Sequence, residues 1–390
     1  MVPNRALSSL TRRQARARAT RMLLCPTLFL ALCFPRESTG QVPGASGKKF
    51  SIPVWHPDAR WTLDPRPYAL DTNCHAAQLD DPRHESMVVQ NIMPRFFGGF
   101  TGGGRYTFVS LDERTDRMHA VTGGTPGLLD GPFARARLYV DDYHTTRHER
   151  AWSADQRFFY FLASFYGQRI RSLDFAEQMV RTVPVKGLAF ACGESGKLYV
   201  VEDSNPAKAI HILSPGPEWK LLRTIALHGG IKLEGLGTSL AVDEKHGRLY
   251  GTTYRATPWY VWYWDLSDGK VHGVLPNCQG KPNARQSGEA GPFEGTVLYN
   301  HGEISWGPDD PDKRFLYVTR VDDFNLYRLD LERKVMAVFS VKQGRFVEQG
   351  KGDGNPLYMY PPHWLPDGSF VGVSTWYDRP PQYKLFRRTR

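Results

Sequence analysis

RFFYFLAS (157–164) is the first of five similar segments, and their repetition decides the fold. The other four are KLYVVED (197–203), RLYGTTY (248–254), RFLYVTRV (314–321) and SFVGVST (369–375). Each is rich in β-branched and aromatic residues, and each follows a polar turn: SADQ, GESG, EKHG, DPDK or PDG. Short β-rich runs that alternate with such turns predict antiparallel hairpins.

Each repeated segment is flanked by further short strands. Upstream lie AWS, GLAFA, TSLAVD, GEISW and PPHWL, and downstream lie QRIRSLDF, AIHILS, YVWYWDL, NLYRLDL and YKLFRR. A fourth strand follows in the first four units: MVRTV, LLRTIAL, VHGVL and VMAVFSV. An earlier unit has RYTFVSLDE (105–113) and RMHAVTG (117–123) as its third and fourth strands. Four antiparallel strands form one propeller blade, so the sequence predicts an all-β, six-bladed β-propeller.

The last unit has no fourth strand of its own. An open ring would expose two unpaired sheet edges, which proteins avoid. We therefore expect KKFSIPVW (48–55) to pair with the C-terminal blade and to close the ring. The alternative is that this segment is a loose leader.

The N-terminus has the features of an export signal. Six arginines between Arg5 and Arg21 precede the apolar run MLLCPTLFLALCF (22–34), and small residues follow at 38–40. This pattern is typical of a cleaved secretory signal over residues 1–40. An uncleaved anchor and a mitochondrial presequence are the alternatives. We expect a periplasmic or extracellular protein that meets a membrane only through this signal, with an N-terminal segment at 41–87 and the propeller at 88–390.

Composition limits the classes of partner. The chain of 390 residues has a formal net charge of +10, but residues 1–40 hold seven arginines and one glutamate, so the remainder carries only +4. This charge does not support nucleic-acid binding. After signal removal Cys74, Cys192 and Cys278 remain, which permits one disulfide of unknown pairing. CxxC and HExxH spacings are absent, so a zinc site is not expected.

The run TPWYVWYWDL (257–266) is the most aromatic stretch. With a period of two residues, Trp259, Val261 and Tyr263 face one side, and Tyr260, Trp262 and Trp264 face the other. Two bulky faces are expected of a strand packed between neighbouring blades. A carbohydrate-stacking platform is the functional alternative.

Two family resemblances follow from these motifs. GGTPGLLDGPFARARL (123–138), followed by Gln168, Arg169, Ile170, Arg171 and Asp174, resembles the NHL-repeat propellers, whose blade strand ends in N-x-R-I-R-x-hydrophobic-D. We therefore interpret the glycine-rich stretch as a connector between blades, since it lacks the residues of a phosphate-binding loop. The later segment KGLAFACGESGKLYVVEDS is similar to gluconolactonase and senescence-marker propellers. In those families an asparagine that binds a divalent metal stands where this chain has Lys186.

Long connections and the loops between second and third strands are expected on one face, where binding residues usually lie. The candidate ligand-binding residues are Asp142, His144, Lys186, Asp203, Asn205, Glu234, Arg255, His301 and His363. The candidate metal ligands are Glu303, Asp322 and Asp323, because carboxylates suit a hard cation such as calcium. No catalytic residue is assigned.

Two functions are compatible with this sequence. The first is an exported NHL-like binding module without catalysis, a monomer that binds a small molecule, a carbohydrate or a protein on the loop face. The alternative is a calcium- or other divalent-metal-dependent hydrolase of lactones or sugar derivatives. Because propellers host many functions, the fold does not decide between them.

Overall fold

The computed structural model describes a large part of the chain. It describes residues 52–64, 87–93, 96–101, 107–112, 117–123, 127–138, 150–155, 157–163, 169–204, 206–228, 231, 239–252, 258–276, 289–294, 296, 298, 302–308, 310–319, 325–352, 363–364, 368–376 and 379–389. The chain divides into two units, Met1–Gly44 and Ala45–Arg390, and all described residues belong to the second. Within these ranges every element is a β-strand, and none of them contains a helix able to cross a membrane.

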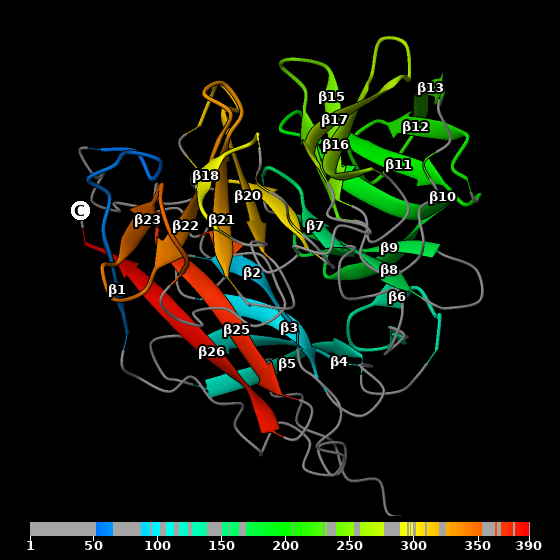
Figure 1. Ribbon diagram of the computed structural model, residues 1–390. Helices are drawn as coiled ribbons and strands as arrows, with labels where there is room; N and C mark the ends of the chain where they lie inside the picture. Colours follow the sequence, from blue (N-terminus) through cyan, green and yellow to red (C-terminus); the bar gives the residue numbers. More distant parts are fainter. Residues whose placement is uncertain are drawn as a thin grey trace, which may run out of the picture. The chain divides into compact units, whose positions relative to one another are not determined.

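The strands form antiparallel sheets in which most neighbours are consecutive in the chain (Figure 1). One sheet contains β2 (Met87–Met93), β3 (Phe96–Thr101), β4 (Thr107–Asp112) and β5 (Arg117–Gly123). Another contains β14 (Leu240–Asp243), β15 (Arg248–Thr252), β16 (Trp259–Asp265) and β17 (Val271–Pro276). A third contains β19 (Ile304–Trp306), β20 (Phe315–Thr319), β21 (Leu326–Asp330), β22 (Val335–Ser340), β18 (Gly291–Pro292) and β23 (Arg345–Val347). Four-stranded meanders of this kind are the units of β-propellers.

The longest strand, β10 (Met179–Cys192), belongs to two successive groups of strands. Its first part pairs with β9 (Arg169–Asp174), which continues to β8 (Phe158–Ala163) and β7 (Arg150–Trp152); β6 (Gly131–Pro132) pairs with the same part of β10. Its second part pairs with β11 (Leu198–Glu202), which continues to β12 (Ala209–Leu213) and β13 (Leu221–Ala226). The register shifts between Thr182 and Lys186, next to Pro184. The sequence predicts two separate strands here, and the structure joins them into one.

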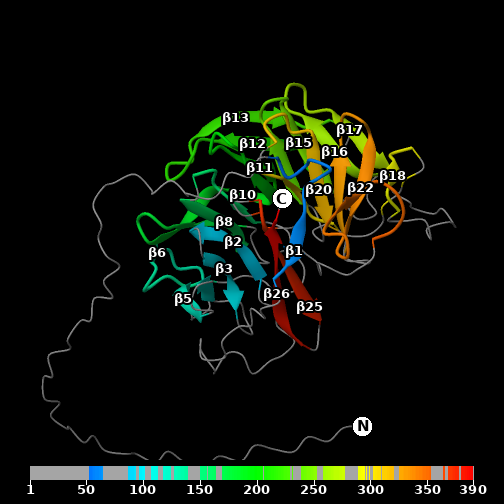
Figure 2. The same ribbon diagram turned by 90° about the vertical axis from the view of Figure 1, so that its left-hand side faces the viewer.

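The two ends of the second unit meet in one sheet. This sheet has the order β24 (His363–Trp364), β25 (Phe370–Trp376), β26 (Arg379–Arg388) and β1 (Trp61–Leu63), and both ribbon views show β1 beside β26 (Figures 1 and 2). Trp61 pairs with Arg388 and Leu63 with Phe386. The edge of β26 that we expected 48–55 to take is occupied by β1; residues 48–51 lie outside the described residues, and the described part of that segment, 52–55, contains no strand. Instead, Arg388 Nη2 donates to the Ile52 and Pro53 carbonyls, which holds this segment beside the sheet.

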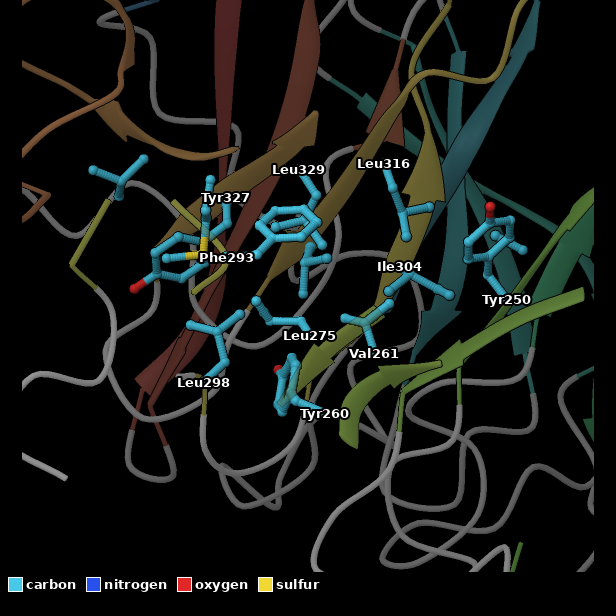
Figure 3. Packing of buried hydrophobic residues seen from close by; sticks show 14 residues of the cluster. Tyr250, Tyr260, Val261, Leu275, Phe293, Leu298, Ile304, Leu316, Tyr327 and Leu329 are labelled. Atoms are coloured by element: carbon cyan, nitrogen blue, oxygen red, sulfur yellow. The ribbon is translucent and has the colours of Figure 1, made fainter. Parts of the chain in front are cut away.

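The core lies between adjacent sheets. Inner strands of successive groups contact each other, β7 with β10, β10 with β14, and β14 with β19. Figure 3 shows one interface, in which Val261 of β16 and Ile304 of β19 contribute to a cluster of 14 buried hydrophobic residues. Polar links reinforce these interfaces: Trp306 Nε1 donates to the Val242 carbonyl at 2.8 Å, and Tyr199 Oη donates to Glu244 Oε1 at 2.8 Å.

The aromatic strand β16 is part of this core. Tyr260, Trp262 and Trp264 are each at most 1% exposed, which confirms core packing for these side chains. Trp262 and Trp264 join the cluster on the side of β10–β13, whereas Tyr260 joins the opposite cluster with Val261. The predicted common face for these three residues is therefore wrong. Register shifts at Trp259–Val261 and Val261–Trp262 break the period of two.

Candidate functional site

Polar residues lie at the same end of three successive strand pairs, β10 with β11, β14 with β15, and β19 with β20. Lys186 and Asp203 lie one residue beyond the last pair of β10 and β11, Gly187 with Glu202. Both side chains are exposed. The structure thus brings these two candidates together at the same end of one sheet, where a cation and a carboxylate lie on consecutive, paired strands.

Glu303 occupies the equivalent position of the sheet that contains β19 and β20. Its backbone carbonyl accepts a hydrogen bond from the Thr319 N–H at 3.0 Å, and its side chain is only 2% exposed. Its neighbours in sequence are fixed by the adjacent sheet: Thr252 Oγ1 donates to the Gly302 carbonyl at 2.6 Å, and Ser239 Oγ accepts from the Ile304 N–H at 3.1 Å. The backbone on both sides of this buried carboxylate is therefore fixed.

Two hydroxyl groups, those of Thr252 and Tyr260, lie next to Gly302, the residue before Glu303. Thr252 and Thr319 are nearly fully buried, and a side chain added at Gly302 would meet the Tyr260 hydroxyl and the Thr319 carbonyl. Glycine is thus required for this close approach of two sheets. The site joins a buried carboxylate with hydroxyl groups, a combination suited to ligands that offer hydrogen-bond donors or positive charge.

Sequence reasoning missed these hydroxyl residues because it selected charged residues and histidines. The strand register could have found them. The Thr252 N–H donates to the Ser239 carbonyl just as the Thr319 N–H donates to the Glu303 carbonyl, so the two pairs occupy equivalent positions in their sheets. His363 begins β24, the first strand of its own sheet. The remaining candidates, Asp142, His144, Asn205, Glu234, Arg255, His301, Asp322 and Asp323, lie outside the described residues.

A metal centre is not assembled within the described ranges. There, no group of three or more His, Cys, Asp or Glu side chains is placed to hold an ion. Of the predicted metal ligands, Glu303 alone is described, and Asp322 and Asp323 are not. Calcium binding therefore stays a prediction.

The glycine-rich stretch that raised the possibility of a phosphate loop has a structural role. It connects β5 to β7, and its described part, residues 127–138, includes β6 on the edge of β10, which confirms the connector interpretation. The fully buried guanidinium of Arg171 donates to Asp130 Oδ1 at 2.7 Å and to the carbonyls of Leu129 and Arg137. Asp130 also accepts from the Thr182 N–H at 2.8 Å, so this connector is fastened to the sheet.

Cys192 is a free thiol at the end of β10. Burial raises its pKa to about 12, and the nearby carboxylates Glu244 and Asp155 act in the same direction. A thiol with so high a pKa is protonated at neutral pH and is a poor nucleophile. Cys74 and Cys278 lie outside the described residues.

Comparison with known proteins gives distant structural likenesses. No family model and no curated protein matches this chain. Similar solved structures include hydrazine synthase of Kuenenia stuttgartiensis, with a TM-score of 0.43, 12% identity, and coverage of 76% of this chain and 74% of that chain. TolB from Acinetobacter baumannii has a TM-score of 0.43, 14% identity, and coverage of 77% and 63%. A nidogen/laminin complex has a TM-score of 0.39, 14% identity, and coverage of 68% and 84%.

The assignment of the fold rests on the sheets of this chain, because the three TM-scores are below 0.5. Successive antiparallel meanders, inner strands in contact and an N-terminal strand in the C-terminal sheet are features of the β-propeller type. The resemblance to NHL-repeat and gluconolactonase-like families stays a prediction.

Proposed function

We propose that the protein is an exported, six-bladed β-propeller that binds a ligand on the face of the propeller where Lys186, Asp203 and Glu303 lie. Its six blades arise if β10 divides the eight-stranded sheet into two blades and β1 completes the last one. The ligand is a small molecule, a carbohydrate or a protein segment. The basic and apolar N-terminus supports export.

The buried Glu303 carboxylate carries this proposal. A carboxylate that is only 2% exposed differs from a solvated turn residue, because a buried charged group needs interactions that compensate for its lost hydration. The hydrogen bonds of Ser239 and Thr252 to Ile304 and Gly302 fix the backbone on both sides of this residue. A prearranged acceptor of this kind favours binding, because less order must be imposed when the ligand arrives.

Thermal-shift measurements with a panel of monosaccharides, oligosaccharides and sugar lactones test the proposal. We expect at least one compound to raise the Tm of the native protein, and Glu303→Gln to abolish that rise. Glu177→Gln is the matched control, because that carboxylate is 49% exposed in the β9–β10 turn. A rise retained in Glu303→Gln would show that the ligand binds elsewhere.

The second candidate function, a metal-dependent lactone hydrolase, is favoured by the same carboxylate. Calorimetry with calcium and a lactone-hydrolysis assay separate the two functions. The ammonium of Lys186 opposes a divalent ion near it, so we expect weak calcium binding in the native protein and tighter binding in Lys186→Asn. Tight calcium binding with lactone turnover by the native protein would replace the binding proposal with the enzymatic one.

A further inference from the structure

A row of polar side chains crosses the sheet that contains β19, β20 and β21. Tyr317 pairs in register with Ser305 on one side and with Arg328 on the other. Directly opposed residues of antiparallel strands project from the same face of a sheet, so these three side chains are neighbours. Trp364 of β24 packs against Tyr317, with ring centroids 4.8 Å apart and an interplanar angle of 67°.

The surroundings of this row are otherwise apolar. Tyr317 and Trp364 belong to a buried cluster with Phe315, Phe346 and Phe370, at the interface between this sheet and the sheet that contains β24 to β26. Four polar atoms of the row and of Trp364 are buried without a hydrogen-bond partner in the protein: Ser305 Oγ, Tyr317 Oη, Arg328 Nε and Trp364 Nε1. Each such group destabilises the folded protein if nothing compensates for its lost hydration. Because Ser305, Tyr317 and Arg328 are neighbours in register and Trp364 packs on Tyr317, one common partner can serve all four.

The chemistry of these groups selects that partner. Arginine and indole N–H groups only donate hydrogen bonds, and the two hydroxyls can donate as well. A partner that accepts from all four is needed. Water accepts at most two hydrogen bonds through its lone pairs, whereas a small anion accepts several at once.

The charge balance also favours an anion. Arg328 is 5% exposed, and the nearest carboxylate oxygen among the described residues, Glu348 Oε1, is 3.8 Å from Nη2. Glu348 is already held by two hydrogen bonds from Arg333, at 2.8 and 3.0 Å. The other Arg328 contacts are with neutral groups: Nη1 donates to the Trp55 carbonyl at 2.7 Å, and the guanidinium lies over the rings of Phe315 and Phe346, 5.3 and 5.1 Å from their centroids.

Other charged groups near Tyr317 do not reverse this balance. Burial raises the pKa of Tyr317, the positive charges of Arg328 and Arg388 lower it, and the carboxylate of Asp310 raises it. Asp310 is committed to the Phe315 N–H, which it accepts at 2.7 Å. Asp330, which also acts on Arg328, accepts two hydrogen bonds from Arg314, so Arg328 and Arg388 are the cations that face the row while these two carboxylates are paired elsewhere.

We propose that a chloride ion binds at this interface, coordinated by Ser305, Tyr317, Arg328 and Trp364. The full burial of Tyr317 restricts the site to a small anion. The ion joins two sheets next to the N-terminal segment, which Arg328 and Arg388 hold through the carbonyls of Trp55, Ile52 and Pro53. Chloride would therefore stabilise the contact of residues 52–55 with these two sheets. This site is separate from the proposed ligand site.

Anion-dependent stability tests the proposal. The full chain is unfolded and refolded in sodium chloride, sodium bromide or sodium gluconate of equal ionic strength, and Tm is measured. We expect Tm to be about 2–4 °C higher in chloride and bromide than in gluconate. Tyr317→Phe should lose this difference and should be no less stable than the native protein in gluconate, because it removes an unpartnered hydroxyl.

Tyr160→Phe is the matched control, because Tyr160 is a buried tyrosine whose hydroxyl accepts from Trp219 Nε1 at 3.2 Å in a different interface. It should lose stability equally in all three salts. Should Tyr317→Phe fail to fold, Trp364→Phe replaces it. An anomalous bromide peak among the four groups in native crystals would support the site. The proposal is overturned by equal chloride gains in Tyr317→Phe and the native protein, by no gain at all, or by water density without a bromide signal.

Discussion

The same pairing of an arginine with an aspartate occurs in two hairpins and explains the final aspartate of the NHL-like motif. Arg157 donates to both oxygens of Asp174, at 3.1 and 2.9 Å, and Arg314 does the same to Asp330, at 2.9 and 2.7 Å. Each aspartate also accepts backbone N–H groups of the next turn. The final Asp174 of the NHL-like motif therefore fixes a hairpin, and nothing in this arrangement is specific to ligand binding.

These aspartates should make stability sensitive to acid. Burial raises the pKa of Asp330, but the hydrogen bond from Arg314 and the turn N–H groups outweigh it, so the pKa lies below its ordinary value. Its contribution is then complete above about pH 4 and is lost as pH falls through the lowered pKa. We expect Asp330→Asn to lower the free energy of unfolding by about 1–3 kcal/mol at pH 7 and by less near pH 3.

Urea unfolding between pH 3 and pH 7 checks this expectation. Asp58→Asn is the control, since Asp58 is 65% exposed beside His56. An Asp330→Asn protein that loses equal stability at both ends of this pH range would contradict the role given to the ionised carboxylate.

The buried Arg171 should resist even a conservative substitution. Its guanidinium contacts one carboxylate and two carbonyls at once, a geometry that a lysine ammonium cannot reproduce. We expect Arg171→Lys to destabilise the protein by about 1–3 kcal/mol, measured by urea unfolding. Arg169→Lys, an exposed change on the same strand, should cost less than about 0.5 kcal/mol. Equal effects of the two changes would show that the connector is held by other contacts.

At the element scale, the sequence predicts strands best where the signal is local. The repeated second strands coincide with β8, β11, β15, β20 and β25, because β-rich runs between polar turns define them within a few residues. The two- and three-residue strands β6, β18 and β23 were not predicted, since they are too short to show a period. The continuity of β10 across Pro184 was missed for another reason: a register shift lets the strand change partners without a turn.

Strand β1 offers a direct test of what anchors an element of three residues. Trp61 is 4% exposed, its Nε1 donates to the Gly368 carbonyl at 2.8 Å, and its ring meets those of Phe339, Phe346, Trp364 and Phe370. We expect Trp61→Ala to lower the free energy of unfolding by about 3–5 kcal/mol. Leu63→Ala, on the same strand but 40% exposed, should change it by less than about 1 kcal/mol. Denaturant unfolding of both variants measures the difference.

For the whole molecule, the sequence predicted that the N-terminal segment completes the last sheet but placed its strand too early. KKFSIPVW alternates better than Trp61–Leu63, yet a strand is selected by the partner that buries its side chains, and that partner is distant in sequence. The candidate site shows the same limit. Lys186 and Asp203 were found from loop position, whereas the hydroxyls around Glu303 become visible only when sheets are placed side by side.

Because β1 pairs with β26 near the C-terminus, we predict that β1 stabilises this sheet equally well when it is attached after Arg390. Because β1 is antiparallel to β26 and Arg388 reaches the Ile52 carbonyl, residues 52–64 can follow Arg390 through a short flexible linker. A protein that begins at residue 65 should have a markedly lower Tm than one that begins at residue 52, because the edge of β26 and the faces of Phe339 and Phe370 become exposed. Attaching residues 52–64 after Arg390 should restore most of the difference in Tm, whereas attaching them with Trp61→Ala should not. Restoration by both attachments, or an unchanged Tm after the deletion, would show that this strand does not hold the two ends together.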